Sequence, residues 1–203
     1  MNEQAKKFIH ERGMEMDKKN ELLAVAREVF AEKGYKAAGI SDIAKKSHMA
    51  VGSFYKYYES KEAIFLEVYV AENSRIREEI TQRVDWQGEP EAIVEQLFAV
   101  TFELISPNKI LAEWNKPGIS QILHDYYNQD AGRASNAFHQ FLIQTFSQRL
   151  QEEGFSKEKI AEIMKVYDLI YYIDMHVTEQ EFSGYFDSLE TLVKYFVKGI
   201  FSK

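Results

Sequence analysis

The chain has 203 residues, a net charge of −7, 45% hydrophobic residues and no cysteine. This size and apolar content allow a buried core and exclude a disordered chain, while the lack of cysteine excludes disulfides and thiolate-bound metals. Because proline and glycine are scarce, at 3 and 10 residues, and no alternation of apolar and polar residues occurs, the sequence predicts an all-α fold.

No stretch has the length and apolarity of a membrane span. The longest near-apolar run covers residues 97–102, whereas a membrane helix needs about 20 apolar residues. The first residues also lack the apolar core of a secretory signal. We therefore expect a cytoplasmic protein without a membrane partner.

The N-terminal part divides into a polar extension and an amphipathic helix. Residues 1–17 are polar and mixed in charge, and we expect them to fray as chain termini commonly do. Residues 18–33 repeat apolar side chains at three- and four-residue intervals, which predicts a helix with one buried face. Gly34 follows directly and is expected to end this helix as its C-terminal cap.

Two short helices joined by a tight turn are predicted next. Ile43 and Ala44 belong to the apolar stripe of the first helix, and Phe54 and Tyr58 turn inward from the second, which we place at residues 50–58. Small, hydroxylic, cationic and aromatic side chains remain on the outer face of the second helix. The major groove of DNA admits one such helix, so the pair is interpreted as a helix-turn-helix.

The run from Gly34 to Phe65 resembles the N-terminal signature of the TetR-like (tetracycline-repressor-like) transcriptional regulators. The matching positions are Phe30, Gly34, Tyr35, Ile43, Ala44, Gly52, Tyr55, Tyr58, Lys61 and Glu62. The resemblance covers about the first third of the chain. It implies a three-helix DNA-binding unit within residues 1–61 and a helical ligand-binding and dimerisation bundle at residues 62–203, with no cofactor.

The resemblance also implies which residues meet double-stranded DNA. The expected DNA-binding residues are Val51, Gly52, Ser53, Tyr55, Lys56, Tyr57 and Lys61. Tyr55 and Lys61 would lie near phosphate, although Tyr55 could equally be a core residue, and the others would enter the major groove. The polar extension could instead supply a phosphate-contacting arm with Lys6, Lys7 and Arg12.

Three positions depart from the family pattern. Gly39 stands where a threonine is usual, so we expect one phosphate contact to be missing. His48 stands where glycine is common in the turn, and histidine tolerates the left-handed conformation better than most residues. Ala50 stands where a hydroxyl residue often caps the recognition helix, which predicts a cap weaker by about 1 kcal/mol.

The charge distribution agrees with this division. Residues 1–61 carry 12 Lys and Arg against 9 Asp and Glu, a net of +3, and residues 62–203 carry 13 against 23, a net of −10. The basic excess therefore accompanies the helix-turn-helix, as nucleic-acid binding requires.

Seven further helices are predicted downstream. Their expected ranges are 61–84, 91–105, 107–114, 119–130, 131–153, 157–176 and 182–201. Pro90 suits the first turn of the helix after it, Ser106 and Pro107 are expected to open the next one, and Ser156 should cap the helix at 157–176. The helix at 91–105 is apolar nearly all round and should be central.

The last two helices carry more apolar positions than one buried stripe needs. The resemblance implies that they pair across a two-fold axis into a four-helix bundle, which would space two recognition helices ~34–36 Å apart on an inverted-repeat operator. The expected interface residues are Tyr167, Phe186, Leu189, Val193, Phe196 and Ile200. Alternatively, both helices close the core of a monomer.

The middle helices are rich in aromatic residues, and the resemblance implies a cavity there for a small apolar or aromatic effector. The candidate pocket residues are Phe98, Phe102, Trp114, Tyr126, Phe138, Phe141 and Tyr171. Ordinary core packing is the commoner role for any one of them. Polar groups that could orient an effector are His124, Asn136, His139, Gln144 and Asp174.

No catalytic signature occurs. None of the five histidines follows an acidic residue at the spacing of di-iron helical sites, and the common hydrolase, metalloprotease and nucleotide-binding motifs are absent. We expect no catalytic or metal-binding residue. The sequence favours a dimeric DNA-binding transcriptional regulator, more specifically a repressor released by its effector. The alternative is a helical ligand-binding or interaction protein without specific DNA recognition.

Overall fold

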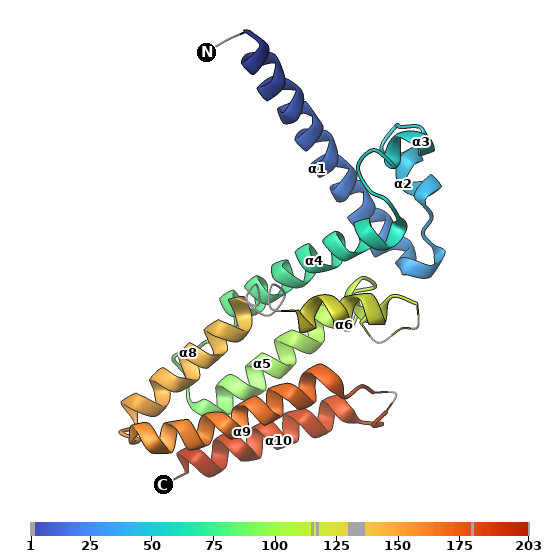
Figure 1. The fold of residues 1–203 in the computed structure, drawn as a ribbon. Coiled ribbons are helices and arrows are strands. Elements are labelled where there is room, and N and C mark those ends of the chain that lie inside the picture. The colour runs from blue at the N-terminus through green and yellow to red at the C-terminus, as the bar shows by residue number, and fades with distance from the viewer. Residues whose placement is uncertain (1–2, 115, 117, 130–136, 180, 203) are drawn as a thin grey trace. The chain divides into compact units, whose positions relative to one another are not determined.

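The computed structural model describes residues 3–114, 116, 118–129, 137–179 and 181–202, and these residues form helices and turns but no strand (Figure 1). The elements are α1 Glu3–Ala37, α2 Ile40–Lys46, α3 Val51–Phe54, α4 Lys61–Arg83, α5 Pro90–Ile105, the 3-10 helix η1 Leu111–Glu113, α6 Ser120–Asn128, α8 Ala137–Glu152, α9 Lys157–His176 and α10 Tyr185–Phe201. The all-α prediction is therefore confirmed.

The chain forms two compact units. Unit 1 comprises Met1–Arg75 and Ile105–Gln129, and unit 2 comprises Ile76–Leu104 and Asp130–Lys203. Residues 105–129 thus belong with the N-terminal helices, although the chain reaches them only after α5. The predicted boundary after Lys61 is a functional one, between DNA-binding and effector-binding parts, and stays a prediction.

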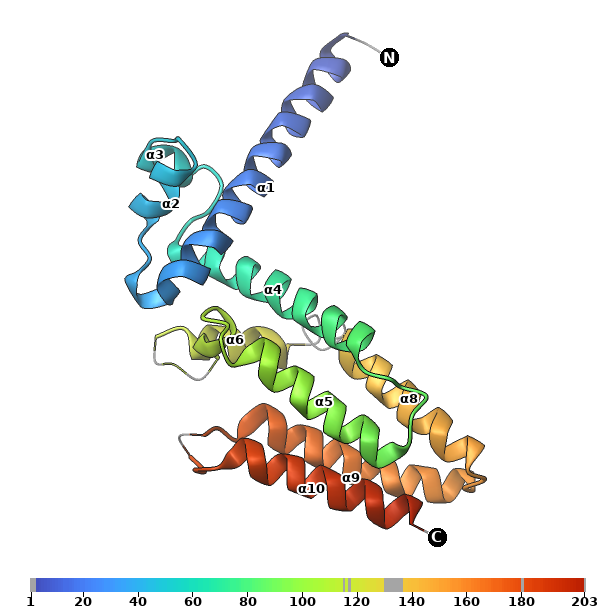
Figure 2. The ribbon, with the colours of Figure 1, turned by 180° about the vertical axis from the view of Figure 1, so that it is seen from behind.

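Unit 1 has an aromatic core in which α1, α2, α3 and α4 meet. Phe30, Phe54 and Phe65 are fully buried, and the rings of Phe30 and Phe65 meet edge to face with centroids 4.9 Å apart. Figure 2 shows α2 and α3 beside the C-terminal half of α1. Such burial of whole aromatic side chains is worth several kcal/mol each, so these short helices are stabilised by packing rather than by their length.

The first helix is longer than the sequence suggested. It begins at Glu3, so the expectation of a frayed extension at residues 1–17 is wrong. The segment is rich in Ala, Lys, Glu, Gln and Met, which are good helix formers, and it extends a helix already nucleated by packing further along. Gly34 ends the regular helix as predicted, because its φ of 75° and ψ of 169° belong to a region that is essentially restricted to glycine.

Residues 105–129 are fastened to the N-terminal helices by polar contacts. Asn108 Nδ2 donates to Glu72 Oε1 at 2.9 Å, Lys109 Nζ donates to the carbonyl of Glu32 at 2.6 Å, and the amide of Tyr35 donates to Glu113 Oε1 at 3.3 Å. These contacts explain why this segment clusters with unit 1.

The helix predicted at 107–114 is wrong: only the 3-10 turn Leu111–Glu113 forms. Ser106 and Pro107 do not open a helix. Instead the Asn108 side chain accepts from the amides of Ile110 and Leu111, both at 3.0 Å. A side chain that holds consecutive amides in this way stabilises a tight turn at the expense of a regular helix.

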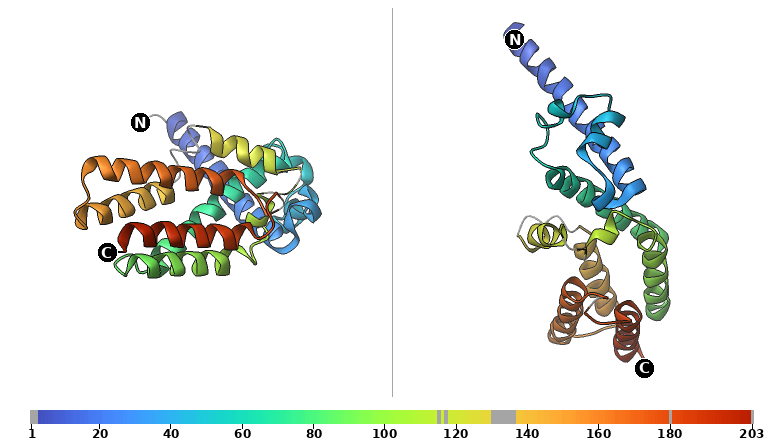
Figure 3. Two further views of the ribbon diagram at one scale, coloured as in Figure 1. Left: turned by 90° about the horizontal axis from the view of Figure 1, so that it is seen from below. Right: turned by 90° about the vertical axis from the view of Figure 1, so that its right-hand side faces the viewer.

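Unit 2 is built from the C-terminal part of α4 together with α5, α8, α9 and α10. Its buried cluster is formed by Val94, Phe98, Leu189 and Val197. Helices α5 and α10 run antiparallel and side by side (Figure 3), and ion pairs join Glu95 to Lys194 and Glu91 to Lys198 along their edge.

Two predicted helix starts in unit 2 agree with the structure, whereas the predicted central position of α5 does not. Pro90 is the first residue of α5, and Ser156 caps α9 by accepting from the amide of Lys159, both as predicted. The expectation that α5 is central is wrong within this chain, because Phe102 is 58% exposed. Part of the apolar surface of α5 therefore lacks cover from the chain itself.

Candidate nucleic-acid interface

Helices α2 and α3 form the predicted helix-turn-helix. Ile43 and Ala44 of α2 are buried, as are Phe54 of α3 and Tyr58 just beyond it. The turn between the helices contains His48 with a φ of 53°, which confirms the left-handed conformation expected there. Because both helices are anchored by buried side chains, the opposite face of α3 is held in a fixed direction.

The second helix is shorter than predicted. It covers Val51–Phe54 rather than residues 50–58, and its N-cap, Ala50, makes no side-chain hydrogen bond. Beyond it the amides of Lys56 and Tyr57 bond to carbonyls three residues back, at 3.2 and 2.9 Å. The chain thus tightens into 3-10-type turns, which are frequent at helix ends, and still turns Tyr58 inward.

The outward side chains of this segment form what we call the recognition face, made of Val51, Gly52, Ser53, Lys56 and Tyr57. Val51, Gly52 and Lys56 are exposed, and Ser53 and Tyr57 are half-buried. Tyr55 is 53% exposed and meets the ring of Phe54 edge-on at 5.5 Å, so it is not a core residue. The face combines an apolar group, a hydroxyl, a cation and an aromatic ring over a span of seven residues.

Lys61, at the start of α4, makes three intramolecular contacts. Its Nζ donates to the carbonyls of Tyr35 and Ala38 at 2.9 and 3.0 Å and lies 4.1 Å from the centre of the Tyr35 ring. The ammonium thereby satisfies carbonyls at the end of α1. An ammonium has three donors, so one remains for another acceptor.

Tyr35 connects the end of α1 to the start of α4. Its hydroxyl donates to Glu62 Oε1 at 2.6 Å, and its ring packs against Phe65 with centroids 4.8 Å apart. Burial and the hydrogen bond to Glu62 raise the pKa of the Tyr35 phenol. The phenol therefore remains a neutral donor, and the junction below the helix-turn-helix is locked.

A buried carboxylate joins α1, α4 and the segment after α5. Glu72 is 3% exposed, and it accepts from Arg27 Nε at 2.6 Å and from Arg75 Nη2 at 2.9 Å. Desolvation opposes ionisation, but hydrogen bonds from Arg75, Arg27 and Asn108 outweigh it and lower the pKa of Glu72 to about 2. A charged, fully partnered Glu72 thus fixes three chain segments of unit 1.

The residues predicted for a dimer interface are mostly half-buried within unit 2. Leu189 lies in the buried cluster of the chain, and Phe186, Val193 and Phe196 pack against that cluster. Tyr167 and Ile200 are half-buried.

Sequence reasoning missed a different set of apolar side chains on α9 and α10, which we call the outer strip. Its members, with their exposed fractions, are Val166 42%, Leu169 58%, Tyr172 59%, Leu192 45% and Tyr195 70%. The three-residue spacing within each helix was a usable signal, because these positions fall outside the stripe that turns inward.

The seven candidate pocket residues are divided between the two units. Trp114 and Tyr126 belong to unit 1, and the other five belong to unit 2. In unit 1, Trp114 stacks on Tyr69 and His124 with ring centroids 6.1 and 4.3 Å apart.

In unit 2, Phe98 and Phe102 both contact Phe186 with ring centroids 5.5 and 5.7 Å apart. Phe138 is buried under the Arg77 guanidinium at 4.9 Å, and Phe141 meets Trp86 edge-on at 4.9 Å.

Of the predicted polar groups in unit 2, His139 lies among aromatic rings, whereas Asp174 is exposed. His139 stacks on Tyr171 with centroids 3.7 Å apart, and its Nδ1 lies 3.3 Å from the Tyr167 hydroxyl. Burial lowers the pKa of His139, although Asp168 opposes the shift. Asp174 accepts a hydrogen bond from the Tyr185 hydroxyl at 3.3 Å. The predicted Asn136 lies outside the described residues.

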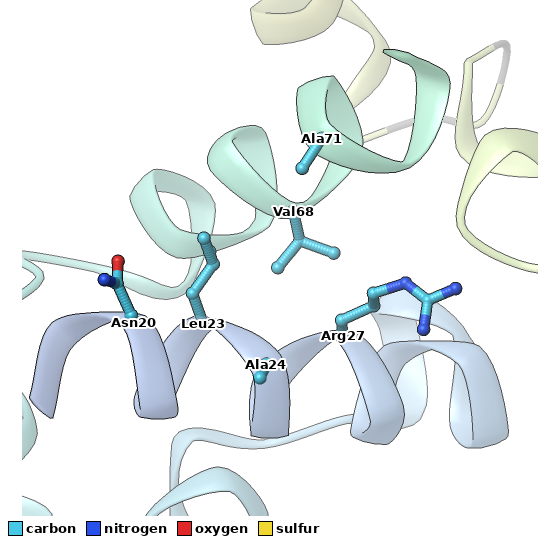
Figure 4. Close-up of a pocket in the computed structure, with 6 residues that line it drawn as sticks. All are labelled: Asn20, Leu23, Ala24, Arg27, Val68 and Ala71. Carbon is cyan, nitrogen blue, oxygen red and sulfur yellow. The ribbon is translucent and has the colours of Figure 1, made fainter. Parts of the chain in front are cut away.

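A shallow pocket with a volume of about 190 Å³ opens on unit 1 (Figure 4). It is lined by Asn20, Leu23, Ala24 and Arg27 of α1 and by Val68 and Ala71 of α4. None of the candidate effector residues lines it.

Within the described ranges, no group of three or more His, Cys, Asp or Glu residues could hold a metal ion. No helix in that part of the chain is long and apolar enough to cross a membrane.

Comparison with known proteins identifies the segment that carries this interface. Residues 22–68 match the family described as "Bacterial regulatory proteins, tetR family". The chain is 36% identical over 64 residues to the HTH-type transcriptional regulator QacR of Staphylococcus aureus, which covers 32% of this chain and 34% of that protein. It is 40% identical over 62 residues to the regulator YdgC of Bacillus subtilis, covering 30% and 32%. The chain thus spans about a third of the length of the curated relatives it matches.

The whole fold also has counterparts among solved structures. A TetR-family transcriptional regulator from Mesorhizobium loti superposes with a TM-score of 0.53 over 91% of this chain and 95% of that one, at 21% sequence identity. At this identity the likeness concerns the fold alone.

Proposed function

The chain belongs to the TetR-like family of transcriptional regulators, and we propose that it acts as a homodimeric repressor that a small effector releases from an inverted-repeat operator. In this proposal, residues 1–61 bind DNA, and residues 62–203 bind the effector and form the dimer.

The observation that carries the DNA-binding proposal is the recognition face. Phe54 and Tyr58 are buried on one side of α3, with exposed fractions of 0% and 4%, which leaves the other side free to enter a major groove. Lys56 makes no ion pair with any described residue, so its charge is available to DNA. Lys61 can add a phosphate contact through its third donor, and Tyr55, which precedes Lys56 in the sequence, is exposed.

Dimerisation through α9 and α10 is supported by surface that the single chain leaves uncovered. The outer strip exposes two leucines and two tyrosines on these helices, at fractions of 45–70%. Large apolar side chains that remain exposed on neighbouring positions of a helix are candidates for an interaction site in soluble proteins. Of the six residues predicted from the sequence, Leu189 is already buried in the chain, and the other five would contribute by completing their half-burial against the partner copy. A two-fold dimer repeats the same patch on both copies and presents two recognition faces to two half-sites.

Effector binding is proposed for the aromatic residues predicted from the sequence. In unit 2, Tyr171 and Phe138 belong to α9 and α8, and His139 and Tyr167 beside them supply polar atoms among aromatic rings. Sites for small molecules combine apolar walls with a few placed polar groups in this way. An effector that binds preferentially to a state with a different spacing of the recognition faces would lower operator affinity through that preference alone.

The proposal is tested by selecting duplexes from a random pool at near-physiological salt and reading the bound sequences. We expect an inverted repeat with half-sites about 10 base pairs apart, centre to centre. The variant with Lys56→Ala and Tyr57→Ala serves as a control and should recover no common sequence. If the unaltered protein enriches no sequence and its weak binding is equal for all duplexes, the alternative of a helical ligand-binding protein without DNA recognition replaces the proposal.

A further inference from the structure

The first residue of the recognition helix is an exposed apolar side chain. Val51 begins α3 and is 44% exposed, while Phe54 three residues later is fully buried. Removing the exposed part of this side chain from water would be favourable in free energy. On a face that otherwise carries polar, small or aromatic groups, Val51 is the aliphatic side chain that is available to an apolar partner.

The groups around Val51 limit what that partner can be. A Cβ added at Gly52 would meet no atom within 4 Å, so the backbone next to Val51 is open to close approach. Residues 49–58 contain no Arg, Asn or Gln, so Lys56 is the one residue of this segment among the side-chain types that make the usual bidentate contacts to guanine and adenine. A short, stiff valine beside a bare glycine suits a surface that comes within van der Waals contact.

Only one base presents an apolar group in the major groove. Thymine carries a C5-methyl there, and the other base edges present donors and acceptors. Valine can neither donate nor accept a hydrogen bond, and in a helix its χ1 is largely confined to one rotamer. Its methyl groups are therefore already oriented, and contact with a methyl costs little side-chain entropy.

We propose that Val51 reads thymine through the C5-methyl group, so that each half-site of the operator carries a thymine opposite Val51. The inference rests on the proposed function, because it assumes that the recognition face enters the major groove. It goes further in naming the base and the chemical group that one residue recognises.

The test replaces the thymines of a selected operator one at a time with deoxyuridine, which keeps the base-pairing edge and lacks only the methyl. For the unaltered protein we expect one position in each half-site to lose about fourfold in affinity, the effect of withdrawing one buried methyl. Val51→Ala should bind the thymine operator more weakly by a similar factor, and it should no longer distinguish thymine from deoxyuridine at that position.

Tyr57→Ala is the matched control from the same face. It should weaken operator binding while keeping the preference for thymine at the Val51 position. Thermal unfolding of Val51→Ala should match that of the unaltered protein, because the side chain is exposed.

The outcomes separate the inference from the proposed function. If the unaltered protein selects no operator, the proposed function fails first. If it binds a selected operator and tolerates deoxyuridine at every position, thymine-methyl recognition is overturned alone. A Val51→Ala variant that still prefers thymine would assign the methyl contact to another residue and would also overturn the inference.

Discussion

The N-terminal helices and the last two helices differ in how far their large apolar side chains are buried. In unit 1 the large side chains Phe30, Phe54 and Phe65 are completely buried within one chain. On α9 and α10 of unit 2, Leu169 and Tyr195 remain 58% and 70% exposed. Unit 1 buries its large aromatic side chains within the chain and leaves a recognition face of mostly polar, small and aromatic groups, with Val51 as its exposed aliphatic side chain, whereas α9 and α10 leave several large apolar side chains exposed. This difference supports the proposed assignment of DNA binding to the first region and of dimerisation to the second.

The sharpest test of this comparison is a double substitution in the outer strip, Leu169→Glu with Tyr195→Glu. Four like charges would face each other across a symmetric contact, so we expect monomers. Because the two half-sites are then bound independently, operator affinity should fall by at least about 100-fold. Light scattering and operator titration measure the two effects.

A contrasting variant is Leu189→Glu, which places the charge in the buried cluster of the same helix. It should unfold unit 2 rather than yield a folded monomer, because an unpaired charge in an apolar core is strongly unfavourable. A folded dimer in the outer-strip variant would place the contact between copies elsewhere.

The second test concerns the polar centre of unit 1. Glu72→Gln removes the charge that Arg27, Arg75 and Asn108 share, and we expect a loss of about 2 kcal/mol in unfolding free energy, as for buried hydrogen bonds to charged groups. Urea denaturation measures it. Glu28→Gln is the control, since Glu28 is an exposed partner of Lys46, and surface substitutions usually stay within about 0.5 kcal/mol.

The same variant should change the dependence of stability on pH. The pKa of Glu72 is lowered to about 2 in the folded chain from an ordinary 4.5. A lowered pKa contributes stability that is present above 4.5 and is lost as the pH falls towards 2. Between pH 5 and 2, the unfolding free energy of the unaltered protein should therefore fall more steeply with pH than that of Glu72→Gln, as denaturation experiments can measure. Parallel pH profiles would show that Glu72 does not keep its charge in the fold.

The third test asks whether Lys61 serves DNA or only the fold. Lys61→Ala should weaken binding to all duplexes and reduce the salt slope of binding by about 0.9, the value of one phosphate contact. Lys46→Ala removes a cation of the same unit that already pairs with Glu28 and should change the slope less. An unchanged slope together with lower thermal stability would restrict Lys61 to its contacts with Tyr35 and Ala38.

The smallest expected effect comes from adding one carbon atom to the recognition helix, which should change DNA binding without harming the fold. Gly52→Ala adds a Cβ that meets nothing within 4 Å in the chain, so unfolding free energy should stay equal or rise by up to about 1 kcal/mol. Operator affinity should fall by about fivefold if the backbone of α3 touches the base edges, since overpacking costs about 1 kcal/mol or more. Unchanged affinity would mean that α3 stands back from the groove.

Much of the fold followed from local patterns. The range of α9, its Ser156 cap, the break at Gly34 and the left-handed His48 all agree with expectation, because each depends on a few neighbouring residues. The predicted interface and pocket residues were chosen from apolar spacing together with the resemblance, and they stay predictions. Spacing distinguishes an apolar stripe, but it does not tell which stripe the rest of the chain covers, as Leu189 and Leu169 illustrate.

The sequence by itself determined the helix-turn-helix and the helical character of the described residues, because helical periodicity and turn residues act over four to ten positions. Tertiary structure alone decided that residues 105–129 join the N-terminal helices, where Glu113 meets the amide of Tyr35 78 positions away. It also decided that Lys61 caps the end of α1 and that the outer strip stays exposed. Such contacts join residues far apart in the chain, and no local pattern encodes the partner of a buried carboxylate.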